Sequence, residues 1–225
     1  IETDDAYTLV EEYMPNGDLF DVIKPDLGMP EENAMQYARQ LISAIEYMHR
    51  CRTAHRDIKP ENVCLAADNT SRLIDFGHAA FLQDCKQDDY IGTVPYMAYE
   101  LLADNANGGG PIDFRQTDMW AFGATLFVMC TGKFPWREAT LTDKEFAHFA
   151  AGGAGPCHRA RWAAFSPALN TLLRHTMCID THRRWTATQA RAFIEEHWGD
   201  GRASHLAVTQ PLGCTAHGSP RLSLV

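Results

Sequence analysis

The segment AHRDIKPENVCL, residues 54–65, places reactive side chains close together on a short loop interrupted by proline. Asp57 and Asn62 carry oxygen atoms that can accept a proton or hold a cation, and Lys59 between them carries a positive charge. Such a set of side chains indicates chemistry on a charged group. Whether the loop can perform it depends on the elements that position the loop and on partners elsewhere in the chain.

The composition indicates a globular protein with an acidic surface. The net charge of −9 argues against a nucleic-acid partner, which would require a basic face. The seven cysteines are odd in number and form no C-x-x-C pair, so neither a disulfide framework nor a zinc site is expected. The longest apolar run, residues 120–130, is too short to span a bilayer, and the segment IETDDAYTLV does not resemble a signal peptide. We therefore expect a cytoplasmic or nuclear protein without a membrane partner.

Strands are expected near the reactive loop. Residues 7–13 are predicted to form one strand, and residues 62–67 and 72–76 a strand pair around a turn. No periodicity survives in residues 77–95, so a long loop is predicted there, and long loops are usually functional. A flexible connector is predicted at residues 104–113.

Apolar spacing predicts that the rest of the chain is mainly helical. The helices are expected at residues 19–23, 30–50, 117–131, 141–151, 167–179 and 186–198. Residues 117–131 are apolar almost all round, which indicates a buried central helix. The residues from Gly199 onward contain no aromatic side chain and are predicted to form a disordered tail, so the folded part is expected to span residues 1–198.

Four short motifs occur in a fixed order along the chain. They are HRDIKPEN at 55–62, DFG at 75–77, AYE at 98–100 and DMWAFG at 118–123. Together they resemble the C-terminal lobe of a eukaryotic protein kinase. The resemblance implies an α+β, protein-kinase-like fold, in which a mainly helical large lobe carries a few short strands around the catalytic and Mg-binding loops. Further segments, including GDLFDVI, GTVPY and TGKFPW, are similar to the SH3-domain-binding kinase group.

The resemblance implies phosphoryl transfer from ATP with Mg²⁺, in which catalysis is mainly positioning and charge stabilisation. Asp57 would orient and deprotonate the substrate hydroxyl, and Lys59 would neutralise the transferring phosphate. Asn62 and Asp75 would hold Mg²⁺ through hard oxygen ligands. A Lys at position 59 and Thr93 in GTVPY resemble serine/threonine kinases, so the expected partner is a protein substrate with a Ser or Thr acceptor.

The same resemblance implies where the nucleotide binds. EEYMPNGD resembles the hinge that bonds adenine through its backbone, here at Glu12 and Met14. Asp18 would bind the ribose hydroxyls, and Cys64 would lie under the adenine ring. Glu11 borders the back of the adenine pocket, where a carboxylate needs a partner or solvent.

Five other matches have structural roles in the family. His55 and Phe76 resemble members of an internal hydrophobic column that is anchored by Asp118. Glu100 and Arg184 are expected to form a buried ion pair. Tyr99 replaces the proline that usually precedes this glutamate, which puts the rigidity of the substrate loop in question.

The activation segment contains no Ser or Thr between Asp75 and Glu100 apart from Thr93. Asp89 stands where many kinases carry a phosphorylated residue, so we expect either that it pairs permanently with Arg56 or that it belongs to a solvated loop face. Tyr90 is a candidate regulatory site. The C-terminal residues RLSLV match a pattern that PDZ domains bind.

The sequence has no candidate for the glycine-rich loop, the strand lysine or the helix glutamate of a kinase small lobe. Either the chain is a fragment of a full kinase, which we expect to have little activity alone, or the protein lacks the small lobe. A pseudokinase or interaction module that keeps the fold is the alternative function. A small-molecule kinase is a third reading, against which GTVPYMAYE argues because it resembles a peptide-docking loop.

Overall fold

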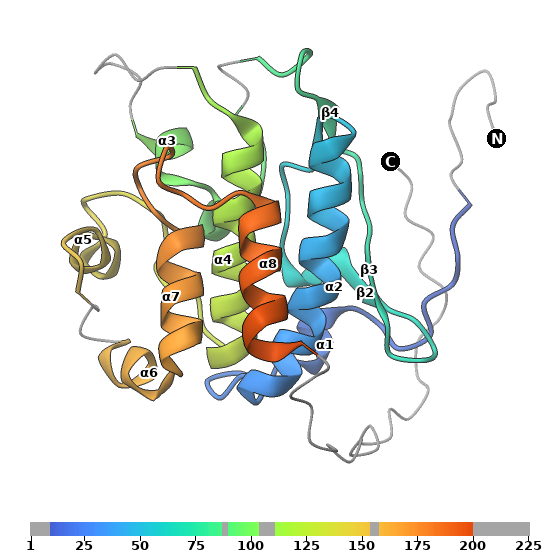
Figure 1. Cartoon of the computed structure of the whole chain (residues 1–225), viewed down its shortest axis with the longest axis horizontal. Helices are drawn as coiled ribbons and strands as arrows, with labels where there is room; N and C mark the ends of the chain where they lie inside the picture. Colours follow the sequence, from blue (N-terminus) through green and yellow to red (C-terminus); the bar gives the residue numbers. More distant parts are fainter. Residues whose placement is uncertain (1–9, 87–89, 104–110, 154–157, 200–225) are drawn as a thin grey trace.

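A computed structural model describes residues 10–86, 90–103, 111–153 and 158–199. These residues form a mainly helical body in which α2 (Glu31–Arg50) and α7 (Pro167–Thr176) pack against the central α4 (Phe114–Thr131), and α8 (Ala187–Trp198) packs against α2 and α7 (Figure 1). The short strands lie along one side of α2 (Figure 1). The fold is therefore α+β with few strands, as the sequence predicts.

Helix α4 is the buried centre of the fold, as its apolar sequence predicts. It begins at Phe114 because Asp113 caps it, with the Asp113 side chain accepting a hydrogen bond from the backbone N–H of Arg115. It ends at Gly132, whose φ of 63° is in the left-handed region. A Cβ at this glycine would lie 2.2 Å from the carbonyl oxygen of Lys24, so glycine also permits close packing against the loop after α1 (Leu19–Val22).

Helix α2 begins and ends close to its predicted bounds. Its apolar positions, including Ala38, Ile42 and Ile45, are buried as their spacing predicts. Glu31 in its first turn accepts hydrogen bonds from both the backbone N–H and the hydroxyl of Ser166, the N-cap of α7. This contact fixes the start of α2 against the start of α7.

The strand pair next to the reactive loop is confirmed, whereas two other predictions about strands are wrong. β2 (Val63–Leu65) pairs antiparallel with β3 (Ser71–Leu73). The loop predicted at residues 77–95 contains β4 (Ala80–Phe81), which pairs with β1 (Thr53–Ala54). Residues 10–13 of the first predicted strand are not a strand, because no described segment pairs with them, and residues 7–9 lie outside the described part.

Helix α5 (Lys144–Ala150) falls within a predicted helix, and α7 and α8 match theirs closely. Two short helices were not predicted, α3 (Tyr99–Leu102) and α6 (Arg159–Ala164), because a helix of one or two turns shows little periodicity. Residues 104–110 of the predicted connector lie outside the described part of the chain, and so do residues 200–225 of the predicted tail.

A buried histidine at the start of α6 should make the stability of the fold sensitive to acid. Burial lowers the pKa of His158 below its ordinary value of 6.5. Between the folded and the unfolded pKa, the unfolded state binds more protons, so the free energy of unfolding should fall as the pH drops below about 6.5. Urea unfolding at about pH 7.5 and about pH 5.5 measures this slope.

The variant His158→Gln should reduce that slope. It should not abolish it, because burial also lowers the pKa of His175. His148→Gln, at an exposed histidine, is the matched control and should keep the wild-type slope. An unchanged slope in His158→Gln would contradict the prediction.

Candidate active site

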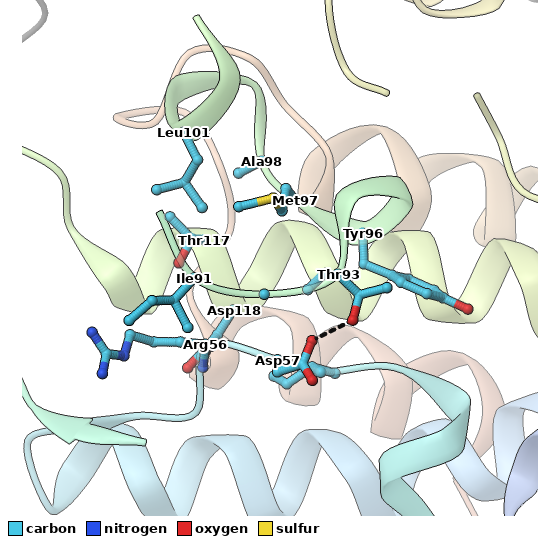
Figure 2. Close-up of a pocket in the computed structure, with 13 residues that line it drawn as sticks. Arg56, Asp57, Ile91, Thr93, Tyr96, Met97, Ala98, Leu101, Thr117 and Asp118 are labelled. Carbon is cyan, nitrogen blue, oxygen red and sulfur yellow. Dashed lines mark hydrogen bonds between the residues drawn. The ribbon is translucent and has the colours of Figure 1, made fainter. Parts of the chain in front are cut away.

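The reactive loop brings Asp57, Lys59 and Thr93 into one closed hydrogen-bonded group. Lys59 Nζ donates to Asp57 Oδ2 at 2.6 Å and to Thr93 Oγ1 at 2.8 Å. Thr93 Oγ1 in turn donates to Asp57 Oδ1 at 2.8 Å (Figure 2). Both carboxylate oxygens of Asp57 are therefore fixed, one by a cation and the other by a hydroxyl that comes from a distant part of the chain.

Asn62 completes the loop from within. Asn62 is the last residue of the one-turn helix η1 (Pro60–Asn62), and its side chain turns back toward Asp57. Asn62 Nδ2 donates to the carbonyl oxygen of Asp57 at 2.8 Å and to Asp57 Oδ2 at 3.2 Å. Because the amide nitrogen is used in this way, the amide oxygen remains as the group that can bind a cation.

Asp75 lies next to Asn62 across the backbone. The N–H of Ile74 donates to the carbonyl oxygen of Asn62 at 2.9 Å, which extends the β2–β3 pairing to the residue before Asp75. Asp75 is exposed and has a φ of 60°, and its Oδ1 accepts a hydrogen bond from Gly77 N–H at 3.1 Å. The structure thus brings together the two predicted cation ligands at the end of one strand pair.

This donor set fits Mg²⁺. Mg²⁺ is usually held by one or two protein carboxylates or amides, with water and substrate phosphates completing its shell. Within the described residues no group of three or more His, Cys, Asp and Glu side chains could enclose a metal ion. A hard cation held by Asn62 and Asp75 together with a phosphate-bearing substrate matches what these residues provide.

The charge state of Asp57 follows from its contacts. Burial by itself would raise the pKa of Asp57, but the hydrogen bonds from Lys59, Thr93 and Asn62 outweigh it, so the pKa lies below its ordinary value. Asp57 is therefore a carboxylate at neutral pH. It is better suited to accept a hydrogen bond from a hydroxyl than to remove a proton early in a reaction.

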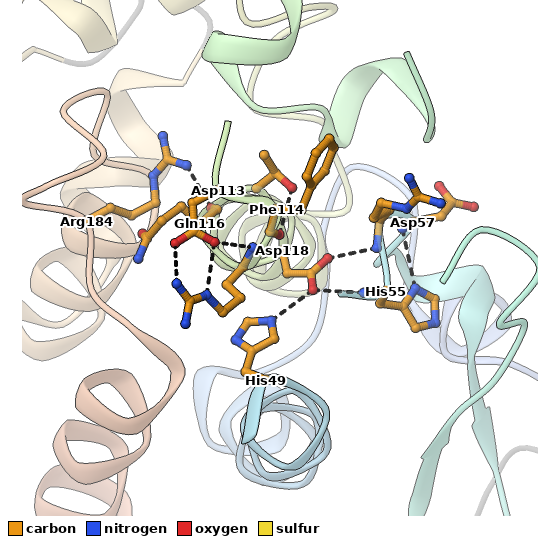
Figure 3. A network of polar contacts seen from close by, with 11 residues as sticks. His49, His55, Asp57, Asp113, Phe114, Gln116, Asp118 and Arg184 are labelled. Carbon is orange, nitrogen blue, oxygen red and sulfur yellow. Dashed lines mark hydrogen bonds and ion pairs between the residues drawn. The ribbon is translucent and has the colours of Figure 1, made fainter. Parts of the chain in front are cut away.

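Asp118 on α4 holds the start of the loop in place. Its side chain accepts hydrogen bonds from the backbone N–H groups of His55 at 2.9 Å and Arg56 at 2.8 Å, and it contacts His49 Nε2 at 2.9 Å (Figure 3). His55 also packs its ring against Phe76, with centroids 5.4 Å apart. The buried central helix is thereby linked to the reactive loop and to the DFG segment.

The segment expected to contact the nucleotide lies beside β2. The N–H of Asn16 donates to the carbonyl oxygen of Leu65 and the N–H of Leu65 to that of Gly17, while Asp18 forms a β-bridge with Cys64. Asp18 also caps α1 through a hydrogen bond from the N–H of Asp21.

The side chains expected around the adenine differ in exposure. Glu11 and Glu12 are exposed, Met14 is half-buried, and Cys64 is partly buried, so Glu11 has the solvent access that its charge requires. Burial, with the carboxylate of Asp18 nearby, raises the pKa of the Cys64 thiol, which is therefore present as the neutral thiol at neutral pH.

Arg184 and Glu100 form an ion pair with two hydrogen bonds, of 2.6 Å and 2.9 Å. The adjacent Tyr99, in place of the usual proline, stacks on Phe146 with centroids 5.5 Å apart, so an aromatic contact holds the start of α3, in the segment expected to dock the substrate. Phe146 belongs to α5, whose position relative to α3 the sequence did not reveal.

The candidate regulatory residues are Arg56, Asp89 and Tyr90, and the structure describes only Arg56 and Tyr90. Asp89 lies outside the described residues, so its predicted contact with Arg56 is not tested. Tyr90 is exposed. Arg56 directs its side chain away from Asp57 (Figure 2), and its Nε donates to the carbonyl oxygen of His78 at 2.6 Å.

Sequence reasoning missed His49 as a partner of Asp118 and Phe114 as a neighbour of Arg56. His49 lies on α2, whose sequence pattern indicates only the apolar positions that face the core. Phe114 lies just before the predicted start of the central helix, and no motif contains it.

Comparison with known proteins identifies the family. The protein kinase domain family matches residues 1–194, and the chain belongs to that family. Serine/threonine-protein kinase SBK1 of Danio rerio is 36% identical over 205 residues, which cover 88% of this chain and 52% of that protein. SBK1 of Mus musculus is 34% identical over 228 residues, covering 98% of this chain and 54% of that protein. Serine/threonine-protein kinase CHK1 of Saccharomyces cerevisiae is 37% identical over 186 residues, covering 79% of this chain and 34% of that protein.

The chain is thus related to eukaryotic serine/threonine kinases and, among them, to the SBK group. It spans about half the length of the SBK1 relatives.

Proposed function

We propose that this chain is the catalytic lobe of a serine/threonine protein kinase that transfers the γ-phosphoryl group of ATP to a protein hydroxyl. The closed group of Asp57, Lys59 and Thr93 is the observation that supports this most directly, because it combines a fixed carboxylate with a cation at bonding distance. Phosphoryl transfer needs such positioning and charge stabilisation.

In this proposal the acceptor hydroxyl donates a hydrogen bond to Asp57, which orients its oxygen toward the phosphoryl group. Because hydrogen bonds lower the pKa of Asp57, the carboxylate accepts the proton late, when the developing P–O bond has made the hydroxyl more acidic. Lys59 stabilises the negative charge on the transferring group, while Thr93 keeps Lys59 and Asp57 aligned. When Mg²⁺ is bound, it neutralises charge on the phosphates. Asn62 and Asp75 would hold the ion through their free oxygen atoms.

The alternative is a pseudokinase that serves as an interaction module. Asn62 argues against it, since its amide is oriented by Asp57 so that the oxygen faces away from that carboxylate, an arrangement that a scaffold does not require. A scaffold would still fold as described, but it would transfer no phosphate in any form of the protein.

We also propose a reducing compartment, the cytoplasm or the nucleus, because the seven cysteines are odd in number and scattered along the sequence. No helix in the described part of the chain has both the length and the apolar character that a membrane span requires. The residues of the candidate PDZ-binding motif lie outside the described part.

The 225-residue chain should show no measurable phosphotransfer, whereas a version extended at its N-terminus to include a kinase small lobe should be active. The reason is that the chain has no candidate for the glycine-rich loop and the strand lysine that bind the ATP phosphates in a kinase small lobe. Transfer of the γ-phosphoryl group to a library of Ser- and Thr-containing peptides, read by mass spectrometry, measures this.

Asp75→Asn in the extended protein is the matched inactive control, because it removes the negative charge of one proposed cation ligand without changing the size of the side chain, and it should show little phosphotransfer. Strong activity of the 225-residue chain would contradict the role assigned to the missing groups. Inactivity of the extended protein, at unchanged folding, would favour the scaffold.

A further inference from the structure

The activation segment of this chain has no free Ser or Thr that a phosphate could modify. Between Asp75 and Glu100 the sequence contains only Thr93, and its hydroxyl is bonded to both Asp57 and Lys59. A phosphate on Thr93 would disrupt the group that the proposed reaction needs. Some feature other than a Ser or Thr phosphate must therefore hold Arg56, the residue before Asp57.

Arg56 is held at both its backbone and its side chain. Its φ of 69° is in the left-handed region, and its backbone N–H donates to Asp118 Oδ1 at 2.8 Å. At the side chain, Nε donates to the carbonyl oxygen of His78, next to the DFG segment, at 2.6 Å. The centre of the guanidinium lies 5.7 Å from the centroid of the Phe114 ring, within the range of a cation–π interaction.

Phe114 and Asp118 are one helical turn apart and so lie on the same face of α4. The N-terminal part of this helix therefore contacts Arg56 twice, once through a carboxylate at the backbone and once through an aromatic ring at the guanidinium. Phe114 is 3% exposed and follows the N-cap Asp113, so its ring is held firmly.

We propose that Phe114 is a positioning residue that holds the Arg56 side chain against the His78 carbonyl, so that the catalytic loop and the DFG segment stay joined without a Ser or Thr phosphate. This inference rests on the proposed kinase function for its consequence, but the contact itself can be tested without activity. Arg56 has at least one further interaction besides these. The pairing with Asp89 that the sequence suggests is an outcome that the test distinguishes.

The test is to replace Phe114 with mono-, di- and trifluorophenylalanine. Fluorine withdraws electrons from the ring face and weakens its attraction for a cation, while the ring changes little in size. The readout is the solvent exchange rate of the Arg56 Nε–H, followed by NMR in the 225-residue chain and assigned by its loss in Arg56→Lys. We expect the rate to rise in steps with fluorine number, by about fivefold at trifluorophenylalanine.

Phe122 provides the matched control. It is 1% exposed on the same helix, and the same fluorination there should leave the exchange rate of Arg56 unchanged. In the N-terminally extended protein, with absence of Ser and Thr phosphate verified by mass spectrometry, the Phe114 series should lower kcat in the same order and leave the KM for peptide unchanged. If Phe114 had only a structural role, the exchange rate and kcat would depend on the size of the ring and not on the number of fluorine atoms.

The outcomes separate this inference from the proposed function. An exchange rate that is insensitive to Phe114 fluorination overturns the inference, and so does one that responds to Asp89→Ala alone. A graded exchange rate in a protein whose extended form transfers no phosphate would support the Phe114 contact and reject the kinase activity.

Discussion

Asp57→Asn in the N-terminally extended protein should reduce phosphotransfer by about a thousandfold. The asparagine keeps the shape of the side chain, so the hydrogen bond from Thr93 Oγ1 can persist at the equivalent oxygen. Two things are lost. The acceptor hydroxyl no longer meets a carboxylate, and Lys59 loses the charge that lies 2.6 Å from its ammonium group. The rate of γ-phosphoryl transfer to a peptide substrate at saturating ATP measures the effect.

The loss should be in catalysis and not in folding or nucleotide binding. The thermal midpoint and the affinity for a nonhydrolysable ATP analogue should therefore stay close to wild type. Asp84→Asn, at an exposed carboxylate of the activation segment, is the matched control and should remain active. An Asp57→Asn variant with a substantial fraction of wild-type activity would show that the closed group of Asp57, Lys59 and Thr93 is not the reaction centre.

The residues of the catalytic loop could be predicted from the sequence because the motifs HRDIKPEN and DFG resemble those of protein kinases and name Asp57, Lys59, Asn62 and Asp75 together. The contacts of Lys59 and Asn62 with Asp57 are local, whereas those with Thr93 and Asp118 join distant parts of the chain. Helix α2 was accessible because its apolar residues recur at helical spacing over twenty residues. Most of α4 was accessible because it is apolar almost all round, although its first three residues lie before the predicted start at 117.

The contacts that the sequence did not reveal are those between distant segments. The pairing of β1 with β4 needs only two residues from each strand, too few to produce a pattern, and it depends on where the chain returns after the DFG segment. The stacking of Tyr99 on Phe146 and of Arg56 on Phe114 likewise depends on how α5 and α4 pack. For residues 10–13 the sequence predicted a strand that the structure does not contain. A strand-like composition forms no strand unless a second segment pairs with it.

Arg184→Met should lower the free energy of unfolding by about 3–5 kcal/mol. The Arg184 side chain is fully buried. It donates hydrogen bonds to the Glu100 carboxylate and to the carbonyl oxygens of Cys178 and Gln116. These contacts join α3 and α4 to the segment before α8. Methionine fills a similar volume but leaves the Glu100 carboxylate, whose side chain is 19% exposed, without its cation. Most of the loss thus comes from an unpaired acid and two unpaired carbonyl groups. Urea unfolding of the 225-residue chain measures it.

A double-mutant cycle separates the ion pair from the other contacts of Arg184. Glu100→Gln keeps a hydrogen-bond acceptor and should cost less than Arg184→Met, because Arg184 retains both carbonyl partners. The variant with both changes should be less destabilised than the sum of the single variants, since neither then leaves a charge without its partner. If the two effects add, the 2.6 Å contact between Arg184 and Glu100 contributes little, and the two backbone carbonyls are the partners that make Arg184 important for stability.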